Sequence, residues 1–209
     1  MKTDLVEKRC IHCARAITRS TSSRDHIPSK FLLVHPYPDN IETIRVCTEC
    51  NRSFAQDEEY MAAFLGTLLW NGDEPKSQLE RILESNWVLQ DDLDDSLFIV
   101  TSDAKQRIAL EPDEQRLRRV VSKNAVGHMF LALGVAPRPS KISICVLENL
   151  PYAVREGLYG LSTGWITVQE GAYRYQLVDQ GALVVRSVIH EFLATEAIWP
   201  SPIGHSAGY

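Results

Sequence analysis

Apolar residues recur at helical spacing in the stretch of the sequence that follows residue 52. The residues that share this spacing are Phe54, Met61, Phe64, Leu65, Leu68 and Leu69. Ser53 and Gln56 have the spacing of a capping box, and three acidic residues follow them, which is favourable near a helix N-terminus. The pattern therefore predicts a helix that begins at Ser53 and ends at the turn residues Asn71 and Gly72.

The middle of the chain combines short patterns of both kinds. Residues 75–87 predict a second, shorter helix, and the acidic run at 91–95 predicts a solvated loop. The apolar residues at 97–100 resemble a strand. Residues 112–133 predict a long helix, because the segment starts with Pro-Asp-Glu and stops at Gly134.

The last third of the chain is rich in β-branched and aromatic residues, with glycine-containing turns between them. Four segments have this composition, namely 142–147, 165–168, 173–178 and 183–189. They predict a small sheet or a long hairpin, although the last of them could instead be a helix running towards Trp199. Taken with the helices before them, these segments predict an α+β fold.

Composition sets the broad class of the protein. With 209 residues, of which 44% are hydrophobic, the chain can bury a core as one large domain or two small ones. The N-terminal residues lack the apolar run of a signal peptide, and nowhere do eighteen uncharged apolar residues follow one another. We therefore expect a cytoplasmic protein with no membrane partner.

Charge is distributed unevenly along the chain, although its sum is only −5. Residues 1–52 contain nine Lys or Arg and six Asp or Glu, whereas the remaining residues contain 13 basic and 21 acidic side chains. Contacts with nucleic-acid phosphates are therefore expected in the N-terminal segment. The residues predicted to make them are Arg9, Arg15, Arg19, Arg24, Lys30, Arg45 and Arg52.

Four of the five cysteines form two Cys-x-x-Cys pairs, Cys10 with Cys13 and Cys47 with Cys50. Two such pairs supply the four sulfurs of a tetrahedral structural Zn²⁺ site. The alternatives are two redox-active pairs or plain buried cysteines. Because the second pair lies at the start of the predicted helix, the site would have the treble-clef arrangement, with His12 as an exposed neighbour.

The residues between and after the cysteine pairs resemble a known family. Asp25-His26-Ile27-Pro28, followed by the ending Cys50-Asn51, is similar to the zinc-bound form of the HNH, or His-Me finger (ββα-metal), endonucleases. The resemblance covers roughly residues 8–60. It implies a metal-dependent endonuclease that hydrolyses phosphodiester bonds in DNA, double-stranded DNA in particular. It also implies a zinc-knuckle nuclease domain at 1–71, which leaves 72–209 as an α+β accessory domain for specificity or homodimer formation.

The resemblance assigns a role to each residue of the motif. His26 would be the general base that activates water, and Asp25 and Asn51 would bind a catalytic Mg²⁺ or Mn²⁺ ion. Because neighbouring residues of an extended segment point to opposite sides, Asp25 and His26 cannot both face the ion. In the family a middle Asn orients the His. Asn40 is the candidate for that role here, while Glu42 occupies the more familiar position.

Several features have a second interpretation. Asp57 and Glu58 could assist the metal, but the helix dipole explains them better. The fifth cysteine, Cys145, is interpreted as a small core residue. For the whole protein, the alternative to an enzyme is a non-catalytic, zinc-stabilised module that binds nucleic acid or acts as an adaptor. A thiol redox protein is a third hypothesis, and it requires reactive thiolates without zinc.

Overall fold

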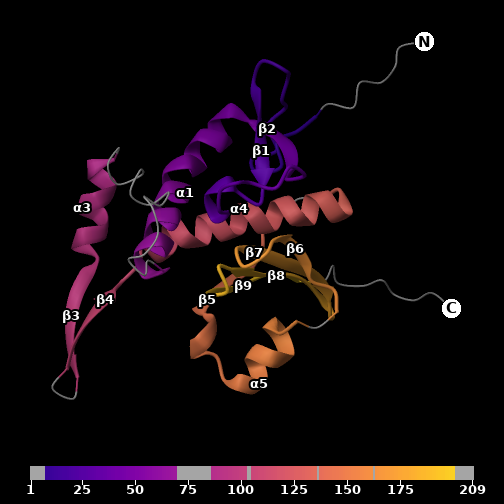
Figure 1. Cartoon of the computed structure of the whole chain (residues 1–209). Helices are drawn as coiled ribbons and strands as arrows, with labels where there is room; N and C mark the ends of the chain where they lie inside the picture. Colours follow the sequence, from indigo (N-terminus) through magenta and orange to yellow (C-terminus); the bar gives the residue numbers. More distant parts are fainter. Residues whose placement is uncertain (1–7, 70–85, 103–104, 136, 162, 201–209) are drawn as a thin grey trace, which may run out of the picture.

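The computed structural model describes residues 8–69, 86–102, 105–135, 137–161 and 163–200. It is an α+β protein in which a long central helix lies between two parts (Figure 1). A β-hairpin and a helix from the N-terminal segment lie on one side of the central helix, and a five-stranded antiparallel sheet lies on the other. The predicted α+β fold class is therefore confirmed.

The N-terminal part, called the finger below, comprises residues 8–69. Strand β1 (Ser22–Ile27) pairs antiparallel with β2 (Glu42–Cys47), and helix α1 (Thr48–Leu69) follows β2 directly. A short 3-10 turn, η1 (Lys30–Leu32), lies in the connection between the two strands and packs on α1. The end of β2 and the first turn of α1 therefore bring the second cysteine pair to one end of the hairpin.

Helix α1 begins at Thr48, before the predicted start at Ser53. The Sγ atom of Cys47 accepts a hydrogen bond from the backbone N–H of Cys50 at 3.3 Å, so a sulfur takes the capping role that the pattern assigned to Ser53. The Ser53 hydroxyl instead donates to the carbonyl oxygen of Cys50 at 2.9 Å, inside the helix. The predicted end at residues 71–72 lies outside the described part of the chain.

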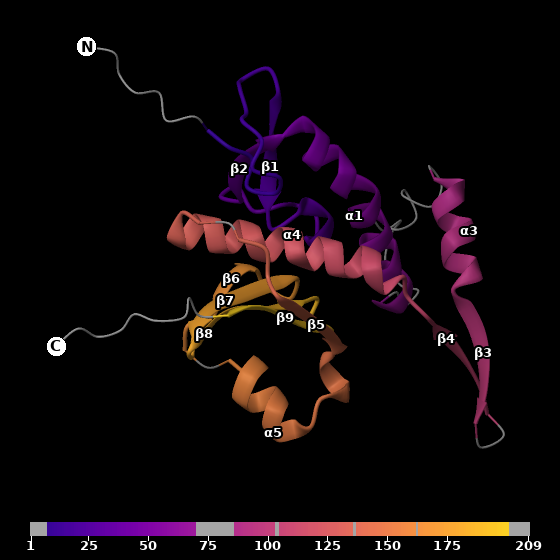
Figure 2. The ribbon, with the colours of Figure 1, turned by 180° about the vertical axis from the view of Figure 1, so that it is seen from behind.

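Helix α4 (Glu114–Leu133) is the central helix, and its prediction is confirmed. The Asp113 carboxylate caps the N-terminus by accepting hydrogen bonds from the backbone N–H groups of Gln115 at 3.0 Å and Arg116 at 3.2 Å. Gly134 ends the helix with a φ of 70°. Because α1 covers one side of α4 and the sheet covers the other (Figures 1 and 2), polar side chains of α4 are buried as well as apolar ones. These buried polar residues are Lys123, Asn124 and His128.

An arm formed by α3 (Trp87–Asp95), β3 (Leu97–Ser102) and β4 (Lys105–Leu110) projects from the rest of the molecule (Figure 1). The strand predicted at 97–100 is confirmed, and β4, its antiparallel partner, has no counterpart in the sequence prediction. The prediction of an acidic loop at 91–95 is wrong, because these residues form the last turns of α3.

The acidic run is helical because apolar residues hold its other face against the core. Leu89 and Leu93 are one turn apart and both are buried in the main core. Asp92 lies on the exposed side and pairs with Arg116 of α4, with a distance of 3.0 Å between oxygen and nitrogen. The charge run therefore marks the solvent-facing side of a helix. Most of the shorter helix predicted at 75–87 lies outside the described residues.

The C-terminal sheet has the strand order β5-β9-β8-β7-β6, and all neighbouring strands are antiparallel. Its strands are β5 (Lys141–Val146), β6 (Ile166–Gln169), β7 (Tyr173–Asp179), β8 (Ala182–Ile189) and β9 (Leu193–Pro200). The sheet that the sequence predicted is therefore present, and β8 is a strand rather than the alternative helix. Strand β9 has no counterpart in the prediction, although it lies between β8 and β5 in the sheet.

Short helical segments lie on the face of the sheet opposite to α4 (Figure 2). They are η2 (Leu147–Asn149), α5 (Tyr152–Val154) and the π-helical η3 (Arg155–Tyr159). Among the described helices none is long and apolar enough to cross a membrane.

The main core joins residues from all parts of the molecule. Leu32 and Phe64 of the finger, Val120 of α4 and Ile189 of the sheet belong to the same group of buried apolar residues. Residues on both sides of the predicted domain boundary, between 71 and 72, therefore contribute to one core. The division into a nuclease domain and an accessory domain stays a prediction.

His128 of α4 predicts a loss of stability in acid. Its side chain is buried, its Nε2 atom lies 3.0 Å from the Tyr173 hydroxyl, and its ring stacks on Tyr175. Burial lowers the pKa of His128 from 6.5 to about 3, so between these values the unfolded chain binds a proton that the folded chain does not. The free energy of unfolding therefore decreases as the pH falls below the pKa of His128 in the unfolded chain, by about 1.4 kcal/mol per pH unit.

The variant His128→Phe tests this prediction, because it keeps a stacked ring that cannot be protonated. Urea unfolding at about pH 7.5 and about pH 5 should show a smaller acid loss in this variant. An unchanged loss would show that His128 is protonated in the folded protein.

Candidate functional site

Four cysteine side chains converge at one end of the finger. The Sγ atoms of Cys10, Cys13, Cys47 and Cys50 all lie within 4.8 Å of one another. The Sγ atoms of Cys13 and Cys47 are 3.7 Å apart. A tetrahedral ion with metal–sulfur distances of about 2.3 Å would hold its sulfurs about 3.8 Å apart. The cluster can therefore hold a metal ion such as zinc, and among the residues described here it is the only group of three or more Cys, His, Asp or Glu that close together.

Two tight backbone turns position the four sulfurs. In the first, the backbone N–H of Ala14 donates to the carbonyl oxygen of Cys10 at 2.8 Å, and Ala14 has a φ of 60°. In the second, the backbone N–H of Cys50 points at the sulfur of Cys47. Burial raises the pKa of Cys50, and it raises the pKa of Cys47 as well. Burial would also raise the pKa of Cys10, but hydrogen bonds from backbone N–H groups, that of Cys47 first, outweigh it and lower that pKa.

Asp25 and His26 are neighbours on β1 and lie on opposite faces of the hairpin. Asp25 is 4% exposed and faces α1 and α4, whereas His26 is half-buried on the other face. Arg24 lies opposite Arg45 in the strand register, and both are exposed on the same face as His26. Burial, and after it the positive charge of Lys30, lower the pKa of His26. The imidazole is therefore neutral at neutral pH, and it shares its face of the hairpin with Arg24 and Arg45.

The inward-facing Asp25 belongs to a buried network that the sequence did not reveal. The Nζ atom of Lys123, on α4, lies 2.6 Å from Asp25 Oδ1 and also forms an ion pair with Glu58 on α1. The Ser29 hydroxyl donates to Glu58 at 2.5 Å, and the Ser29 backbone N–H donates to Asn124 at 2.8 Å. Lys123 is 2% exposed, so its charge is neutralised inside the protein by two carboxylates. Glu58 is therefore a partner of a buried lysine rather than a residue that only complements the helix dipole.

His12, expected to be an exposed neighbour of the cysteines, is largely buried. Its side chain is 7% exposed, and its ring packs edge-on against Phe54 with 4.9 Å between ring centroids. The Nε2 atom of His12 lies 3.7 Å from Asp25 Oδ2. Neither atom has a hydrogen-bond partner among the described residues, although both are buried. The expectation was wrong because α1 places Phe54 over the first cysteine turn, a contact that the local spacing does not reveal.

The two asparagines of the predicted site lie in different surroundings. Asn51 is half-buried in the first turns of α1, directly after Cys50. Asn40 is exposed in the loop before β2, and no contact within the described part of the chain links it to His26. The role of Asn40 in orienting the histidine stays a prediction.

The predicted phosphate-binding residues are exposed, except for Lys30, which is half-buried. Several of them already have contacts within the finger. Arg15 pairs with Glu49 at the surface, Arg45 donates to the Ser22 hydroxyl at 3.1 Å, and the Lys30 ammonium lies 5.1 Å from the ring centre of Tyr37. These side chains are available at the surface of the finger because such exposed contacts are weak.

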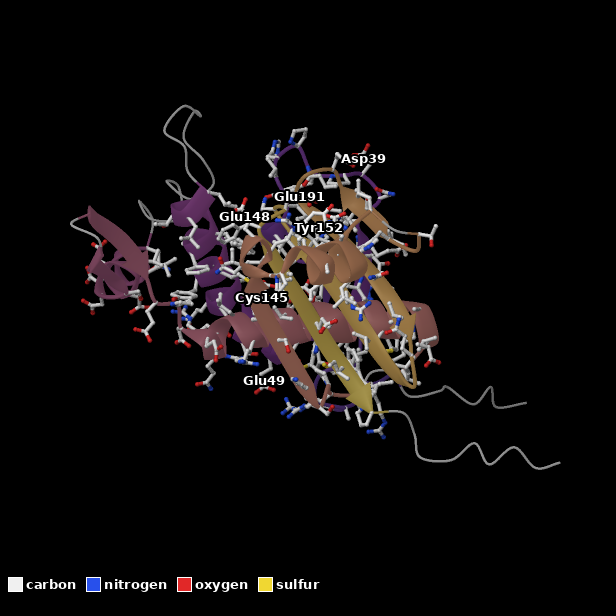
Figure 3. All side chains as sticks on the ribbon, turned by 90° about the horizontal axis from the view of Figure 1, so that it is seen from below. Asp39, Glu49, Cys145, Glu148, Tyr152 and Glu191 are labelled. Carbon is white, nitrogen blue, oxygen red and sulfur yellow. The ribbon has the colours of Figure 1, made fainter. Side chains whose placement is uncertain are left out.

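The opposite side of the molecule has a different character. Figure 3 shows Glu148 and Glu191 with Cys145 and Tyr152 on the face of the sheet that α5 covers. Glu191 pairs there with Arg174 of β7 at 3.1 Å. The Cys145 thiol is half-buried, lies 3.7 Å from a backbone carbonyl oxygen, and has a pKa raised by burial. This thiol is therefore not activated, in agreement with its interpretation as a structural residue.

No protein-family model, curated protein or solved structure matches this chain. The resemblance to HNH endonucleases therefore depends on the residues of the finger alone.

Proposed function

We propose that this chain is a metal-dependent endonuclease of the HNH type, which hydrolyses phosphodiester bonds in DNA. One observation carries the proposal. Beside the four-cysteine cluster, a single strand presents an inward carboxylate with an unpartnered oxygen, Asp25, and an outward, neutral imidazole, His26. Arg24 and Arg45 lie on the same face of the hairpin as His26. A phosphodiesterase needs an anionic metal ligand, a neutral base and cationic phosphate contacts, and these residues supply all three.

In this proposal the four cysteines hold a structural Zn²⁺ ion in a treble-clef finger. The 3.7 Å spacing of two of the sulfurs supports tetrahedral coordination. A site closed by four sulfurs leaves no open position for water or phosphate. Zinc would therefore fix the hairpin against α1, and it would take no part in hydrolysis.

The residues that would hold a second, catalytic ion are Asp25 and Asn51. Asp25 fits this role, because its Oδ2 atom is buried and has no hydrogen-bond partner among the described residues, while Lys123 holds Oδ1. Asn51 follows a zinc-binding residue of the proposed frame, so its position on α1 is fixed. When bound, Mg²⁺ or Mn²⁺ would polarise the scissile phosphate and neutralise the leaving oxygen.

His26 would act as the general base. Its lowered pKa keeps an imidazole nitrogen free to take a proton from the attacking water at neutral pH. Arg24 and Arg45, on the same face of the hairpin, would bind the phosphates that flank the scissile bond. Duplex DNA suits this arrangement, because an exposed hairpin with two guanidinium groups can follow its phosphates without reading bases.

His26→Ala is expected to lower the cleavage rate about 10²–10⁴-fold, because a positioned base contributes about that factor. DNA affinity and metal content should stay close to those of the unchanged protein. The assay is nicking of a supercoiled plasmid with Mg²⁺ or Mn²⁺ and with EDTA. His35→Ala is the matched control, because His35 is exposed in a loop, with its ring edge-on to Tyr37. If the His26 variant cleaves at the original rate, His26 is not the base.

A second function, nucleic-acid binding without catalysis, is favoured by the state of Asp25. This carboxylate is 4% exposed and already forms an ion pair with Lys123, so a divalent ion must share it with an internal ammonium group. A zinc-stabilised finger that binds DNA would need only its exposed arginines. Absence of metal-dependent cleavage with any DNA or RNA, combined with retained binding, would select this function over the nuclease.

Both functions predict that DNA binding depends on Arg24 and Arg45. The double variant Arg24→Ala/Arg45→Ala removes two phosphate contacts, so the slope of log K against log salt should become shallower by about 2. Fluorescence anisotropy over a salt series measures this slope. Lys141→Ala, an exposed change at the start of β5, is the control and should leave the slope unchanged. Equal slopes for all three proteins would place the DNA-binding surface elsewhere.

A further inference from the structure

The first cysteine turn contains a histidine that the proposed zinc frame does not use. We propose that His12 is a further protein ligand of the divalent ion at Asp25, so that the site binds a first-row transition ion such as Mn²⁺ in preference to Mg²⁺. This inference rests on the proposed function, because it concerns the same ion. The assignment of His12 adds an imidazole nitrogen to a site for which the sequence motif predicts only oxygen ligands, from Asp25 and Asn51.

Two buried atoms that lack partners support this assignment. His12 Nε2 and Asp25 Oδ2 are both buried without a hydrogen-bond partner in the described part of the chain, and they are 3.7 Å apart. A separation of 3.7 Å is too long for a hydrogen bond between nitrogen and oxygen. Leaving two such atoms unsatisfied is unfavourable, because each has lost its hydrogen bonds to water without gaining a partner in the protein. In the tautomer that carries its proton on Nδ1, the His12 ring presents an acceptor nitrogen to a carboxylate oxygen, and a cation between the two atoms would satisfy both.

The distance between the two atoms is close to that between two ligands of one ion. At metal–ligand distances of about 2.1 Å, neighbouring octahedral ligands are about 3.0 Å apart and ligands on opposite sides of the ion are about 4.2 Å apart. The observed separation is 3.7 Å. A shift of about 0.5–0.7 Å, which side-chain rotation allows, would bring the two atoms to one of these two separations.

The charges around Asp25 leave room for a cation. Lys123 binds Asp25 through Oδ1 and binds Glu58 as well, so two carboxylates face one ammonium group. The local charge of these three groups is negative. The ion pair also fixes the plane of the Asp25 carboxylate, and Oδ2 is the oxygen that remains for a second cation.

Helix α1 aligns the third ligand of the site. The His12 ring packs edge-on against Phe54, at an interplanar angle of 66°. Asn51 is three residues before Phe54 on α1, so the two side chains lie on the same face of the helix. The face of α1 that contacts His12 is thus the face that contains Asn51. We therefore assign Asn51 of α1 as the third ligand, beside His12 of the cysteine turn and Asp25 of β1.

This ligand set determines which metals bind well. Imidazole suits Mn²⁺, Zn²⁺, Ni²⁺ and other transition ions, whereas Mg²⁺ prefers oxygen ligands and retains several waters. We therefore expect Mn²⁺ to bind more tightly than Mg²⁺, and we expect the preference to depend on His12.

The experiment measures metal binding to the full-length, zinc-loaded chain without any assay of cleavage. Titration with MnCl₂, followed by the EPR signal of free Mn²⁺, should show one Mn²⁺ site in addition to zinc. His12→Phe keeps a ring against Phe54 and removes the nitrogen, so it should weaken Mn²⁺ binding by at least about tenfold to a hundredfold. His35→Phe, an exposed change next to Tyr37, is the matched control and should bind Mn²⁺ normally. Zinc content and the circular dichroism spectrum report whether each variant is folded.

A second measurement avoids the variant at His12 altogether. In the unchanged protein, electron spin-echo modulation of bound Mn²⁺ should show coupling to an imidazole nitrogen, and the coupling should persist in His26→Ala. Loss of the coupling in His26→Ala, absence of any nitrogen coupling, or unchanged Mn²⁺ affinity in His12→Phe would each overturn the assignment of His12. DNA cleavage without nitrogen coupling would leave the nuclease function standing without His12. Nitrogen coupling without cleavage of any nucleic acid would leave the His12 site standing and remove the nuclease function.

Discussion

Cys47→Ser is expected to abolish zinc binding and to unfold the finger. Structural Zn²⁺ sites in small fingers contribute about 10–16 kcal/mol of apparent binding free energy, which is as large as the whole stability of a typical domain. Cys47 has two roles, because its sulfur belongs to the cluster and also accepts the hydrogen bond that caps α1. A serine oxygen can keep the cap, but it is a poor replacement for a thiolate ligand. Zinc content by mass spectrometry and circular dichroism spectra measure the two effects.

The finger depends on zinc because its own apolar core is small. The buried apolar residues at the cysteine end of the hairpin are Cys10, Ile27, Ile44, Val46 and Cys47, so two of the five are proposed metal ligands. Without the ion, four thiol groups would lie close together with no favourable interaction to hold them. Chelation should therefore expose the hairpin and loosen its contact with α4.

Cys145→Ser is the control for the zinc prediction. Cys145 is half-buried in β5 and does not belong to the cluster, so this variant should keep its zinc and its fold. Protein prepared under reducing conditions that contains no zinc and is nevertheless folded would refute the structural zinc site. The thiol redox hypothesis would then be the one to pursue.

The parts of the fold that the sequence predicted are those with local signals. Helix α4 was predictable because Asp113 and Gly134 mark its two ends. The acidic residues at 91–95 were predicted to be a loop from their charge alone. Leu89 and Leu93, one helical turn apart, are the apolar residues that bury the other side of this helix. Strand β9 was not recognised because its place between β8 and β5 depends on pairing with residues distant in sequence.

The same distinction applies to the candidate site. The cysteines and the Asp25-His26 pair have short spacings, so the motif itself identifies them. Lys123 is 98 positions after Asp25, and only the packing of α4 against β1 brings the two together. In the sequence, nothing distinguishes Lys123 from an ordinary exposed lysine on a helix. Its burial follows from α4 being covered on both sides, a property of the tertiary structure.

The burial of Lys123 leads to the second large prediction. Lys123→Met keeps most of the side-chain volume but leaves Asp25 and Glu58 as two buried carboxylates without their counter-ion. Removing one partner of a buried ion pair is unfavourable by about 3–5 kcal/mol, because the remaining charge is desolvated. We therefore expect Lys123→Met to lower the free energy of unfolding by about that amount. Urea unfolding with zinc present throughout measures the change.

Two further variants test the physical reason. Lys141→Met removes an exposed lysine and should change stability by less than about 0.5 kcal/mol. The double variant Lys123→Met/Glu58→Gln removes one of the two buried negative charges and should be more stable than Lys123→Met alone. If the double variant is no more stable, the loss in Lys123→Met comes from packing and not from charge.

Divalent ions should partly rescue Lys123→Met, because they can replace the missing positive charge between the carboxylates. A ligand present at about 100 times its dissociation constant stabilises the folded state by about 2.7 kcal/mol. Millimolar Mn²⁺ should therefore raise the unfolding free energy of Lys123→Met more than that of the unchanged chain, in which Lys123 already occupies one oxygen of Asp25. A larger Mn²⁺ effect in the variant would mean that the ammonium group and the divalent ion compete for the same carboxylates. Full stability of Lys123→Met in the absence of any divalent ion would mean that the buried network is not held together by this charge.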